Sequence, residues 1–351
     1  MNNLKFQLGF LYIRIEVIIF VYNYLKIYID VGDSMNISYD LEHLNIGLVL
    51  SGGGAKGAYE VGVFKALWEL DLVNNIKVVS GTSIGSVNAL FLAMNDKEIL
   101  NSGWSSLSYS RFIHKQESIR IAKVSQLIDR VRHSENRILE ELKISDIGLL
   151  SQSGIENFID DFVDIETVRK SEKDIYACTY NIDKERPEYF KLDEFSEEDV
   201  KKIVLASCAV PYIFKPITFN GNRYADGGIN APQYSKNNVD NVPITPLKSY
   251  ECDFIIVVHL SYKNPINKDE FKDSNVIEIF PSSSLEPING IGTIILDHQR
   301  LMNNIELGYR DAMVILAPII INLIKGKDIL HLIDKNDESN NLLVKKNKIF
   351  D

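Results

Sequence analysis

Cysteine is scarce in this chain, and the cysteines that are present form no paired motif. Cys178, Cys208 and Cys252 are widely spaced and odd in number, and no CxxC occurs. A disulfide framework uses an even set of cysteines, and a zinc site uses clustered ligands. The pattern therefore argues against both and indicates three reduced, buried thiols in a cytoplasmic protein.

Positive charge is also in short supply. The chain has 38 Lys and Arg against 48 Asp and Glu, which gives a formal net charge of −10. Nucleic-acid binding requires a basic surface that neutralises phosphates, so no nucleic-acid partner is expected. The same balance argues against simple electrostatic attraction of the whole chain to an anionic membrane.

No long apolar run is free of charge near the N-terminus. Phe10–Ile29 is rich in Ile, Val, Tyr and Phe, but Arg14, Glu16 and Lys26 interrupt it, and central charges are costly in lipid. No small-residue cleavage site of a signal peptide follows it. We consider a peripheral membrane anchor, an extra strand or helix, and a start misassigned upstream of Met35, and we favour the last.

Hydrophobic patterns in the first third of the chain predict a repeated strand and helix. Ile46–Leu50 is a continuous apolar run, typical of a parallel strand buried on both faces. A glycine-rich loop follows, and Ala58–Leu70 has apolar residues at helical spacing. Lys77–Ser80 then reads as a strand and Gly85–Met94 as a helix. This order predicts an α/β fold with a mainly parallel sheet.

Further elements are expected along the rest of the chain. They are strands at Asp174–Asn181, Glu188–Lys191 and Asp253–Leu260, a hairpin within Phe219–Ala225, and helices at Glu197–Leu205 and Ile294–Ala312. We expect residues 1–44 to form an extension, 45–312 a catalytic domain with core motifs at 46–260, and 313–351 a helical tail. Met313–Ile324 is apolar but short for a bilayer span, and the chain is expected to fray and become disordered from Asn336.

A helical insertion is expected at about residues 104–145. Between Arg111 and Lys143 it has eight Lys and Arg against five Asp and Glu, so it is net basic within an acidic chain. A solvated helical surface is the first interpretation. A lid or a surface that faces lipid phosphates is the second.

The glycine loop Ser51–Gly57 contains Gly52, Gly53 and Gly54 in succession. Its GxGxxG spacing matches a dinucleotide fingerprint, but the next strand does not end in the acid that would hold a ribose. Lys56 is followed by Gly57, so a P-loop is not indicated either. Consecutive glycines before a helix still let backbone N–H groups converge on an anion, such as the oxyanion of ester cleavage.

Ser83 lies in Gly81-Thr82-Ser83-Ile84-Gly85, which matches the GxSxG nucleophile elbow. Flanking glycines Gly81 and Gly85 avoid clashes in the sharp turn from strand to helix. Serine needs a base to accept its proton. Asp226, followed by Gly227 and Gly228 at the end of an expected strand, is the preferred base.

A histidine base is the alternative. His259 lies within an apolar strand and His298 within a helical segment, where histidine is more often packed or exposed than catalytic. We therefore keep a Ser–Asp–His arrangement open but favour an ester-cleaving site without histidine.

These segments together resemble the patatin-like phospholipase family, and a bacterial member of it. The resemblance rests on the glycine loop, Gly81–Gly85 and Asp226–Gly228 in the family's order, and extends to Ala206–Pro216 and Asp240–Pro243. It covers roughly Ile46 to Ala312. One departure is the longer link at Asn230–Val239, which we expect to alter substrate access.

The resemblance implies a three-layer α/β/α fold and lipid acyl hydrolysis through an acyl-enzyme, as in phospholipase A or lysophospholipase. It assigns the nucleophile to Ser83, the base to Asp226 and the oxyanion hole to Gly52, Gly53 and Gly54. Lys56 would orient the loop, or be an ordinary surface lysine. No metal or cofactor is implied. The expected partner is a lipid or membrane surface, reached by a cytoplasmic protein that is peripheral at the membrane.

Two other functions remain open at this point. An acyltransferase would use the same Ser83 and Asp226, with an acceptor alcohol in place of water. A nucleotide-binding protein would use the GxGxxG loop at Gly52–Gly57.

Overall fold

The computed structural model describes residues 41–107, 151–211, 213–228, 239–262, 265–285 and 297–347. The chain divides between Tyr39 and Asp40 into two compact units, and all of these residues belong to the second. Most of the basic insertion and the link at 230–239 lie outside the described residues. The start of the expected catalytic domain at residue 45 falls inside the second unit.

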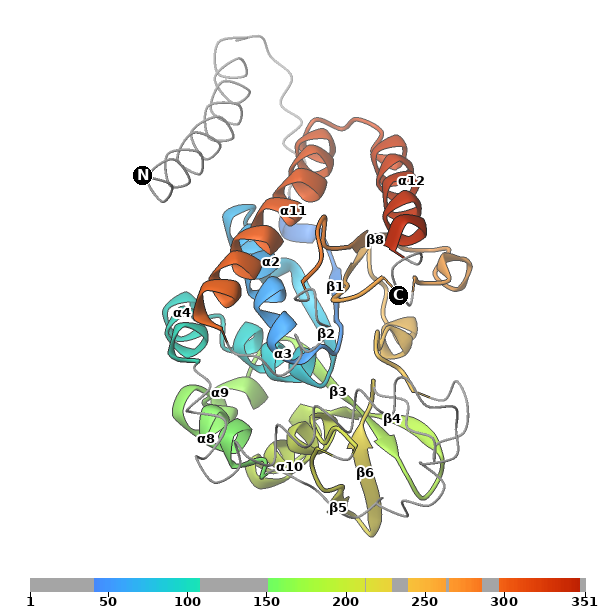
Figure 1. The fold of residues 1–351 in the computed structure, drawn as a ribbon. Helices are drawn as coiled ribbons and strands as arrows, with labels where there is room; N and C mark the ends of the chain where they lie inside the picture. The colour runs from blue at the N-terminus through green and yellow to red at the C-terminus, as the bar shows by residue number, and fades with distance from the viewer. Residues whose placement is uncertain are drawn as a thin grey trace, which may run out of the picture. The chain divides into compact units, whose positions relative to one another are not determined.

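One sheet organises the described unit, with strand order β5-β6-β3-β2-β1-β7-β8 and β4 paired to β3 (Figure 1). Its strands are β1 (Ile46–Leu50), β2 (Ile76–Thr82), β3 (Asp174–Asn181), β4 (Arg186–Lys191), β5 (Ile217–Phe219), β6 (Asn222–Asp226), β7 (Phe254–Val258) and β8 (Asn275–Ile279). The pairs β3-β2, β2-β1, β1-β7 and β7-β8 are parallel. The pairs β3-β4, β3-β6 and β5-β6 are antiparallel. The expected mainly parallel sheet is confirmed, and β8 was not foreseen.

Strand β1 shows why the sheet is sandwiched between two layers. All five of its residues are buried. Ile46, Leu48 and Leu50 pack into one large core, whereas Val49 packs into a second, smaller core on the opposite face. Alternate side chains of a strand point to opposite faces, so a strand apolar at every position must be covered on both.

The larger core is covered by helices. The helices are α2 (Ala58–Glu69), α3 (Ile84–Met94), α4 (Lys97–Ser106), α8 (Ser153–Phe162), α9 (Ile165–Arg169), α10 (Glu197–Ser207), α11 (His298–Ile324) and α12 (Leu330–Asn347). Helix α11 lies across α2, and α12 follows beyond the β8 edge of the sheet (Figure 1). The smaller core is covered by residues 242–252, which include the short 3₁₀ helix η5 (Thr245–Ser249). The expected fold of a central sheet flanked by helices is confirmed.

Helix α11 corrects the interpretation of Met313–Ile324 as a separate short segment. It runs without a break for 27 residues, from His298 to Ile324. The charged pair Arg310-Asp311 does not end it, because the Asp311 carboxylate accepts hydrogen bonds from Tyr59 and from Ser282 inside the fold. The length argument against a bilayer span was therefore wrong, and α11 crosses the boundary expected after residue 312.

Helix α12 corrects the prediction of fraying from Asn336. It continues to Asn347. The side-chain amides of Asn336 and Asn340 each donate a 2.9 Å hydrogen bond to the carbonyl of Glu278 in β8. The asparagines that suggested a frayed tail therefore satisfy a backbone acceptor on an edge strand, which needs a partner when it is covered.

Candidate active site

Ser83 lies on the turn between β2 and α3, as its motif predicts. Its backbone has φ 55° and ψ −124°, a strained conformation for a residue with a side chain, and it is the N-cap of α3. Such a turn lifts the serine hydroxyl out of the sheet and places it at the positive end of a helix. Ser83 keeps 7% of its surface exposed, so the hydroxyl is sheltered without being sealed.

The two glycines of the elbow allow this turn to close. A Cβ on Gly81 would lie 2.3 Å from the carbonyl oxygen of Gly85, and one on Gly85 would lie 2.4 Å from that of Leu50. Both distances are too short for any side chain. Gly81 and Gly85 are therefore required by the packing of the elbow against β1.

Ser207, at the end of α10, holds the elbow from the other side. The Ser83 N–H donates to the Ser207 hydroxyl at 2.8 Å, and that hydroxyl donates to the Cys178 carbonyl at 2.6 Å. All three residues are buried. Sequence reasoning did not single out Ser207, although it lies in the Ala206–Pro216 segment that carried part of the resemblance.

Strand pairing brings Asp226 to the same end of the sheet as Ser83. Asp226 ends β6 and is opposite Thr179 on β3, while Thr82, next to Ser83, is opposite Cys178. Tyr176–Cys178 pair with β2 and β4, and Thr179–Asn181 pair with β6 and β4, so β2 and β6 lie along the same side of β3, opposite β4. The two strands therefore meet end to end, and their last residues, Thr82 and Asp226, lie opposite consecutive residues of β3.

Asp226 is fully buried, and hydrogen bonds fix both its backbone and its carboxylate. The backbone N–H of Asp226 donates to Ala209 at 2.9 Å. Its Oδ1 accepts the N–H of Gly228 at 2.8 Å. Gly227 lies against Cys178, with its ideal Cβ position 2.8 Å from the Cys178 carbonyl oxygen, so the Asp-Gly-Gly turn fits closely onto β3.

The Cys208 thiol is close to both the serine and the aspartate. Burial raises the pKa of its thiol, and the charge of Asp226 raises it further, whereas hydrogen bonding to Ser86 and to Ser83 lowers it. The pKa of Cys178 is likewise raised by burial and then by the charges of Asp240 and Asp226. The prediction of buried cysteines is confirmed for all three.

Gly52 packs directly against the serine. An ideal Cβ on Gly52 would lie 3.3 Å from the Ser83 Cβ and 2.5 Å from the Asn241 side-chain oxygen. The N–H of Gly52 donates to the Asn241 carbonyl at 3.1 Å, and the Asn241 amide donates back to the Gly52 carbonyl at 3.3 Å. The N–H of Gly52 is therefore already bonded within the fold and is not free to donate to an oxyanion. What Gly52 provides is space beside Ser83.

Gly53 and Gly54 differ from Gly52 in this respect. Within the described part of the chain, neither of their N–H groups donates to a protein acceptor. Gly54 has φ 56°, and it opens the 3₁₀ turn η2 (Gly54–Gly57) that leads into α2. The N–H groups of Gly53 and Gly54 are consequently available to an anion.

Lys56 and Gly57 close the loop onto the elbow. Lys56 is buried, so its interpretation as an ordinary surface lysine is wrong. Its stem passes beside Gly53, whose ideal Cβ position lies 3.2 Å from the Lys56 Cε, and its N–H donates to the Gly53 carbonyl. An ideal Cβ on Gly57 would lie 2.5 Å from Ile84, the residue after Ser83. The lysine thus forms part of the packing that shapes the loop.

Asp240 and Asn241 join the three motifs, which sequence reasoning did not foresee. The Asp240 carbonyl accepts from the Thr82 hydroxyl at 2.8 Å, and its N–H donates to Gly227 at 2.8 Å. Tyr189 donates to the Asp240 carboxylate at 2.6 Å. Burial raises the pKa of this carboxyl, although the bonds from Tyr189 and Val242 oppose the rise. The Asp-Asn-Val-Pro motif thereby fastens the aspartate turn to the elbow.

His259 is engaged elsewhere. It directly follows β7, its Nε2 lies 2.9 Å from the Glu278 carboxylate, and its ring stacks on Phe280 at 3.9 Å. His298 is exposed at the start of α11. Neither arrangement favours a histidine base for Ser83.

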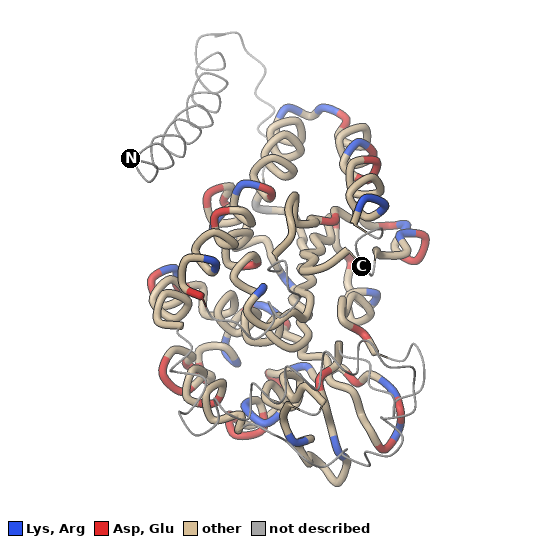
Figure 2. Tube along the Cα trace, in the orientation of Figure 1, with Lys and Arg blue, Asp and Glu red and all other residues tan. Residues whose placement is uncertain are grey.

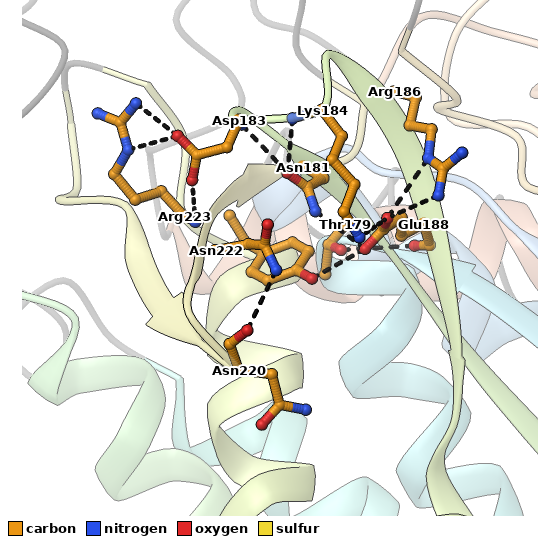
Figure 3. A network of polar contacts seen from close by, with 10 residues as sticks. Thr179, Asn181, Asp183, Lys184, Arg186, Glu188, Asn220, Asn222 and Arg223 are labelled. Atoms are coloured by element: carbon orange, nitrogen blue, oxygen red, sulfur yellow. Dashed lines mark hydrogen bonds and ion pairs between the residues drawn. The ribbon is translucent and has the colours of Figure 1, made fainter.

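A polar cluster around Glu188 fixes β6 to β3 and β4 (Figure 3). The Glu188 carboxylate accepts hydrogen bonds from Asn181 on β3, Tyr224 on β6, Lys184 and Arg186. Burial alone would raise its pKa, but these four donors outweigh burial and hold the pKa at about 2. Since Tyr224 lies two residues before Asp226, the cluster fixes the strand that carries the aspartate.

A family comparison decides what this assembly belongs to. The profile described as "Patatin-like phospholipase" matches residues 48–248, which include the glycine loop, the elbow and the aspartate turn. The chain belongs to the patatin-like phospholipase family.

Curated relatives of this patatin-like chain share parts of it. It is 30% identical over 184 residues to uncharacterized protein R571 of Acanthamoeba polyphaga mimivirus, covering 52% of this chain and 57% of that protein. It is 28% identical over 227 residues to lysophospholipase nte1 of Aspergillus terreus, covering 65% of this chain but 12% of that protein. Probable lipid hydrolase 463L of Invertebrate iridescent virus 6 is 23% identical over 251 residues, which cover 68% of this chain and 80% of that protein.

The chain thus spans about half of the first of these relatives and a small part of the second. These relatives are viral and fungal, so the expected bacterial membership stays a prediction.

Solved structures give distant matches to the patatin-like unit. VipD from Legionella pneumophila matches with a TM-score of 0.42 at 16% identity, over 80% of this chain and 67% of that one. Human GIVD cytosolic phospholipase A2 matches with a TM-score of 0.39 at 10% identity, over 86% of this chain and 61% of that one.

Proposed function

We propose that this protein is a lipid acyl hydrolase in which Ser83 is the nucleophile and Asp226 the base. The observation that carries the proposal is the register of β2, β3 and β6, which sets the elbow serine and a fully buried aspartate at one end of the sheet. Family membership and the name of the lysophospholipase relative support a lipid ester as substrate.

The proposed reaction begins when the Asp226 carboxylate accepts the Ser83 proton. The Ser83 oxygen attacks the ester carbonyl carbon, and the developing oxyanion is stabilised by the N–H groups of Gly53 and Gly54 and by the positive end of α3. The intermediate collapses to an acyl-enzyme as the alcohol or lysolipid leaves with the proton. Water, deprotonated by Asp226, then releases the fatty acid and restores Ser83.

The enclosure of both groups is useful for this chemistry. A carboxylate in water is a weak base for a hydroxyl. Around Ser83 and Asp226 the surroundings are apolar thiols, backbone and buried serines, so charges interact there more strongly than in water. Donors already fixed in the fold need no rearrangement when the oxyanion forms.

The test is product analysis by mass spectrometry on a mixed panel of phospholipids and lysophospholipids. Ser83→Ala and Asp226→Asn should each abolish fatty-acid release and labelling by a fluorophosphonate, whereas the exposed Ser249→Ala should retain both. Fatty-acid release by purified Ser83→Ala equal to that of wild type would refute the proposal. Adding an acceptor alcohol in the same assay measures how far acyl transfer competes with hydrolysis.

Nucleotide binding at Gly52–Gly57 is examined in parallel by thermal shift with NAD and ATP. Because the N–H of Gly52 is bonded to Asn241, we expect no stabilisation by either nucleotide. Stabilisation that Ser83→Ala leaves unchanged would favour the nucleotide function.

A further inference from the structure

Exposed large apolar side chains are confined to one part of the described chain. They are Val314 and Ile324 on α11, and Leu330 and Leu342 on α12, with exposed fractions of 68%, 39%, 56% and 68%. Single exposed apolar residues scattered over a surface are ordinary, but a set gathered on one helical hairpin indicates an interaction site.

The α11 residues form a continuous stripe along its outer side. Val314, Ala317, Pro318, Ile321 and Ile324 are spaced by three or four residues, so they share one face of the helix. Each of them is exposed or partly exposed. The most apolar part of α11 is long enough to cross a bilayer, yet 44% of it is buried inside the protein. A helix packed against the protein on one side presents its other side as a surface that can lie along a bilayer.

Cations lie at both ends of the stripe. The exposed Arg310 precedes Val314 by one turn, and Lys325 and Lys327 follow Ile324. Figure 2 shows two basic residues and one acidic residue at the turn between α11 and α12, next to an α11 segment that has no charged residue. An apolar face bounded by Arg and Lys is the pattern of a helix that inserts among phospholipid headgroups. This local arrangement differs from the acidic balance of the whole chain.

The stripe is mechanically connected to the catalytic end of the sheet. Asp311, one turn before Val314, accepts hydrogen bonds from the Tyr59 hydroxyl at 3.0 Å and from the Ser282 N–H at 2.8 Å. Tyr59 follows the glycine loop by two residues, at the start of α2. The stripe therefore begins one turn from a buried hydrogen-bonded clamp that joins α11 to the helix leaving the oxyanion loop.

We propose that the α11 stripe, residues Val314 to Ile324, docks this protein on the surface of a bilayer containing anionic phospholipid. The apolar side chains would enter the boundary between headgroups and acyl chains, and Arg310, Lys325 and Lys327 would lie at the level of the phosphates. The proposal deepens the proposed function, because docking here would deliver lipid to Ser83. In a two-fold dimer built on this face, Arg310, Lys325 and Lys327 would meet their own copies, so the charge favours an anionic lipid surface over a second copy of this chain.

The experiment uses the full chain with Ser83→Ala, so that vesicles stay intact. Co-sedimentation with phosphatidylcholine vesicles, with and without phosphatidylglycerol, compares Val314→Asp/Ile324→Asp with Leu342→Asp. Leu342 is as exposed as Val314 but lies twelve residues into α12, outside the stripe. We expect the stripe variant to lose roughly tenfold or more in vesicle affinity and Leu342→Asp to bind as the parent does. Lys327→Glu should weaken binding only where phosphatidylglycerol is present.

Three results would overturn the docking proposal. One is equal vesicle binding by the stripe variant and the Leu342 variant. Another is a concentration-dependent dimer, seen by light scattering, that the stripe variant dissolves while vesicle binding is unchanged. The last is hydrogen-exchange protection of residues 314–324 that disappears in a chain starting at Met35, since residues 1–34 would then be the occupant.

Failure of the catalytic proposal is recognised separately. With Ser83 present, the stripe variant should still hydrolyse a water-soluble short-chain ester at the parental rate, while hydrolysis of vesicle lipid falls with its affinity. If the parent hydrolyses no ester at all but shows the predicted vesicle binding, the catalytic proposal fails and docking stands.

Discussion

The backbone N–H of Ser83 donates a 2.8 Å hydrogen bond to the hydroxyl of Ser207. This bond joins a strained residue at the end of β2 to the last residue of α10. The Ser207 hydroxyl in turn donates a hydrogen bond to the Cys178 carbonyl on β3. A short relay of two bonds therefore fixes the elbow to the neighbouring strand.

Ser207→Ala should loosen the elbow. The variant leaves the buried N–H of Ser83 without its acceptor, which costs about 1–3 kcal/mol. We expect a fall in kcat of tenfold or more on a soluble ester and lower stability in urea. Ser207→Thr retains the hydroxyl and should recover most of the rate. Equal rates for wild type and Ser207→Ala would show that the relay has no part in positioning Ser83.

Gly52→Ala should slow catalysis without unfolding the protein. The added Cβ would lie 3.3 Å from the Ser83 Cβ and 2.5 Å from the Asn241 oxygen, so the loop must move. We expect a loss of about 10²-fold in kcat, comparable to the loss of one oxyanion donor. Gly103→Ala is the matched control, because its nearest neighbour is the Phe91 ring at 3.3 Å, remote from the motifs. The prediction fails if both variants hydrolyse ester equally well.

Glu60 should make stability fall as pH rises. Burial raises the pKa of its carboxyl well above the ordinary value, although bonds from Asn88 and Ser51 oppose the rise. The folded protein therefore holds a proton that the unfolded chain releases above about pH 4.5. Between that pH and the folded pKa, this group lowers stability by about 1.4 kcal/mol per pH unit.

Glu60→Gln removes this dependence while keeping an oxygen that can accept the Asn88 amide. Urea unfolding from pH 5 to 8 should show a shallower decline for the variant than for wild type. Parallel curves for the two proteins would mean that Glu60 is ionised in the fold.

Glu188 should have the opposite pH dependence. Its folded pKa of about 2 lies below the ordinary 4.5, so its stabilising effect is present above pH 4.5 and is lost as pH falls toward 2. After allowance for solvent screening, we expect about 1–2 kcal/mol at neutral pH. Glu188→Gln should lose that amount near pH 7, and its difference from wild type should shrink as the pH falls from 4.5 toward 2.

The same variant reports on the site, because the cluster fixes β6 (Figure 3). Ester hydrolysis by folded Glu188→Gln should be reduced through displacement of Asp226. The exposed Glu198→Gln, whose carboxylate bonds only Lys202 among the described residues, is the control. A wild-type rate in folded Glu188→Gln would separate the cluster from the site.

Replacing His259 and His298 by Asn should leave the ester rate of the folded enzyme within a small factor of wild type. His259→Asn should also lower the melting temperature, because it leaves the largely buried Glu278 without its ring partner. Activity is compared at matched folded fractions. A loss as large as that of Ser83→Ala would restore a histidine to the catalytic machinery.

Local patterns in the sequence were sufficient to predict the elbow and the loop. A buried strand followed by glycine, serine and an apolar helix specifies a sharp turn through short-range sterics alone, and Ser83 lies at such a turn. The motifs likewise identified Asp226 as the end of a strand. Sequence patterns predicted the helices near the C-terminus less well, because polar residues such as Asn340 and Asp311 bond to residues far away in the sequence.

The tertiary structure decided how these parts combine. Only the antiparallel pairing of β6 with β3 brings Asp226 near Ser83, and no local signal encodes that register. Only the approach of Asn241, 189 residues away, occupies the N–H of Gly52 and leaves those of Gly53 and Gly54 as donors. Side-chain types and short turns follow from steric limits between near neighbours. Which donors are occupied depends on contacts between remote segments, which exist only after the chain has folded.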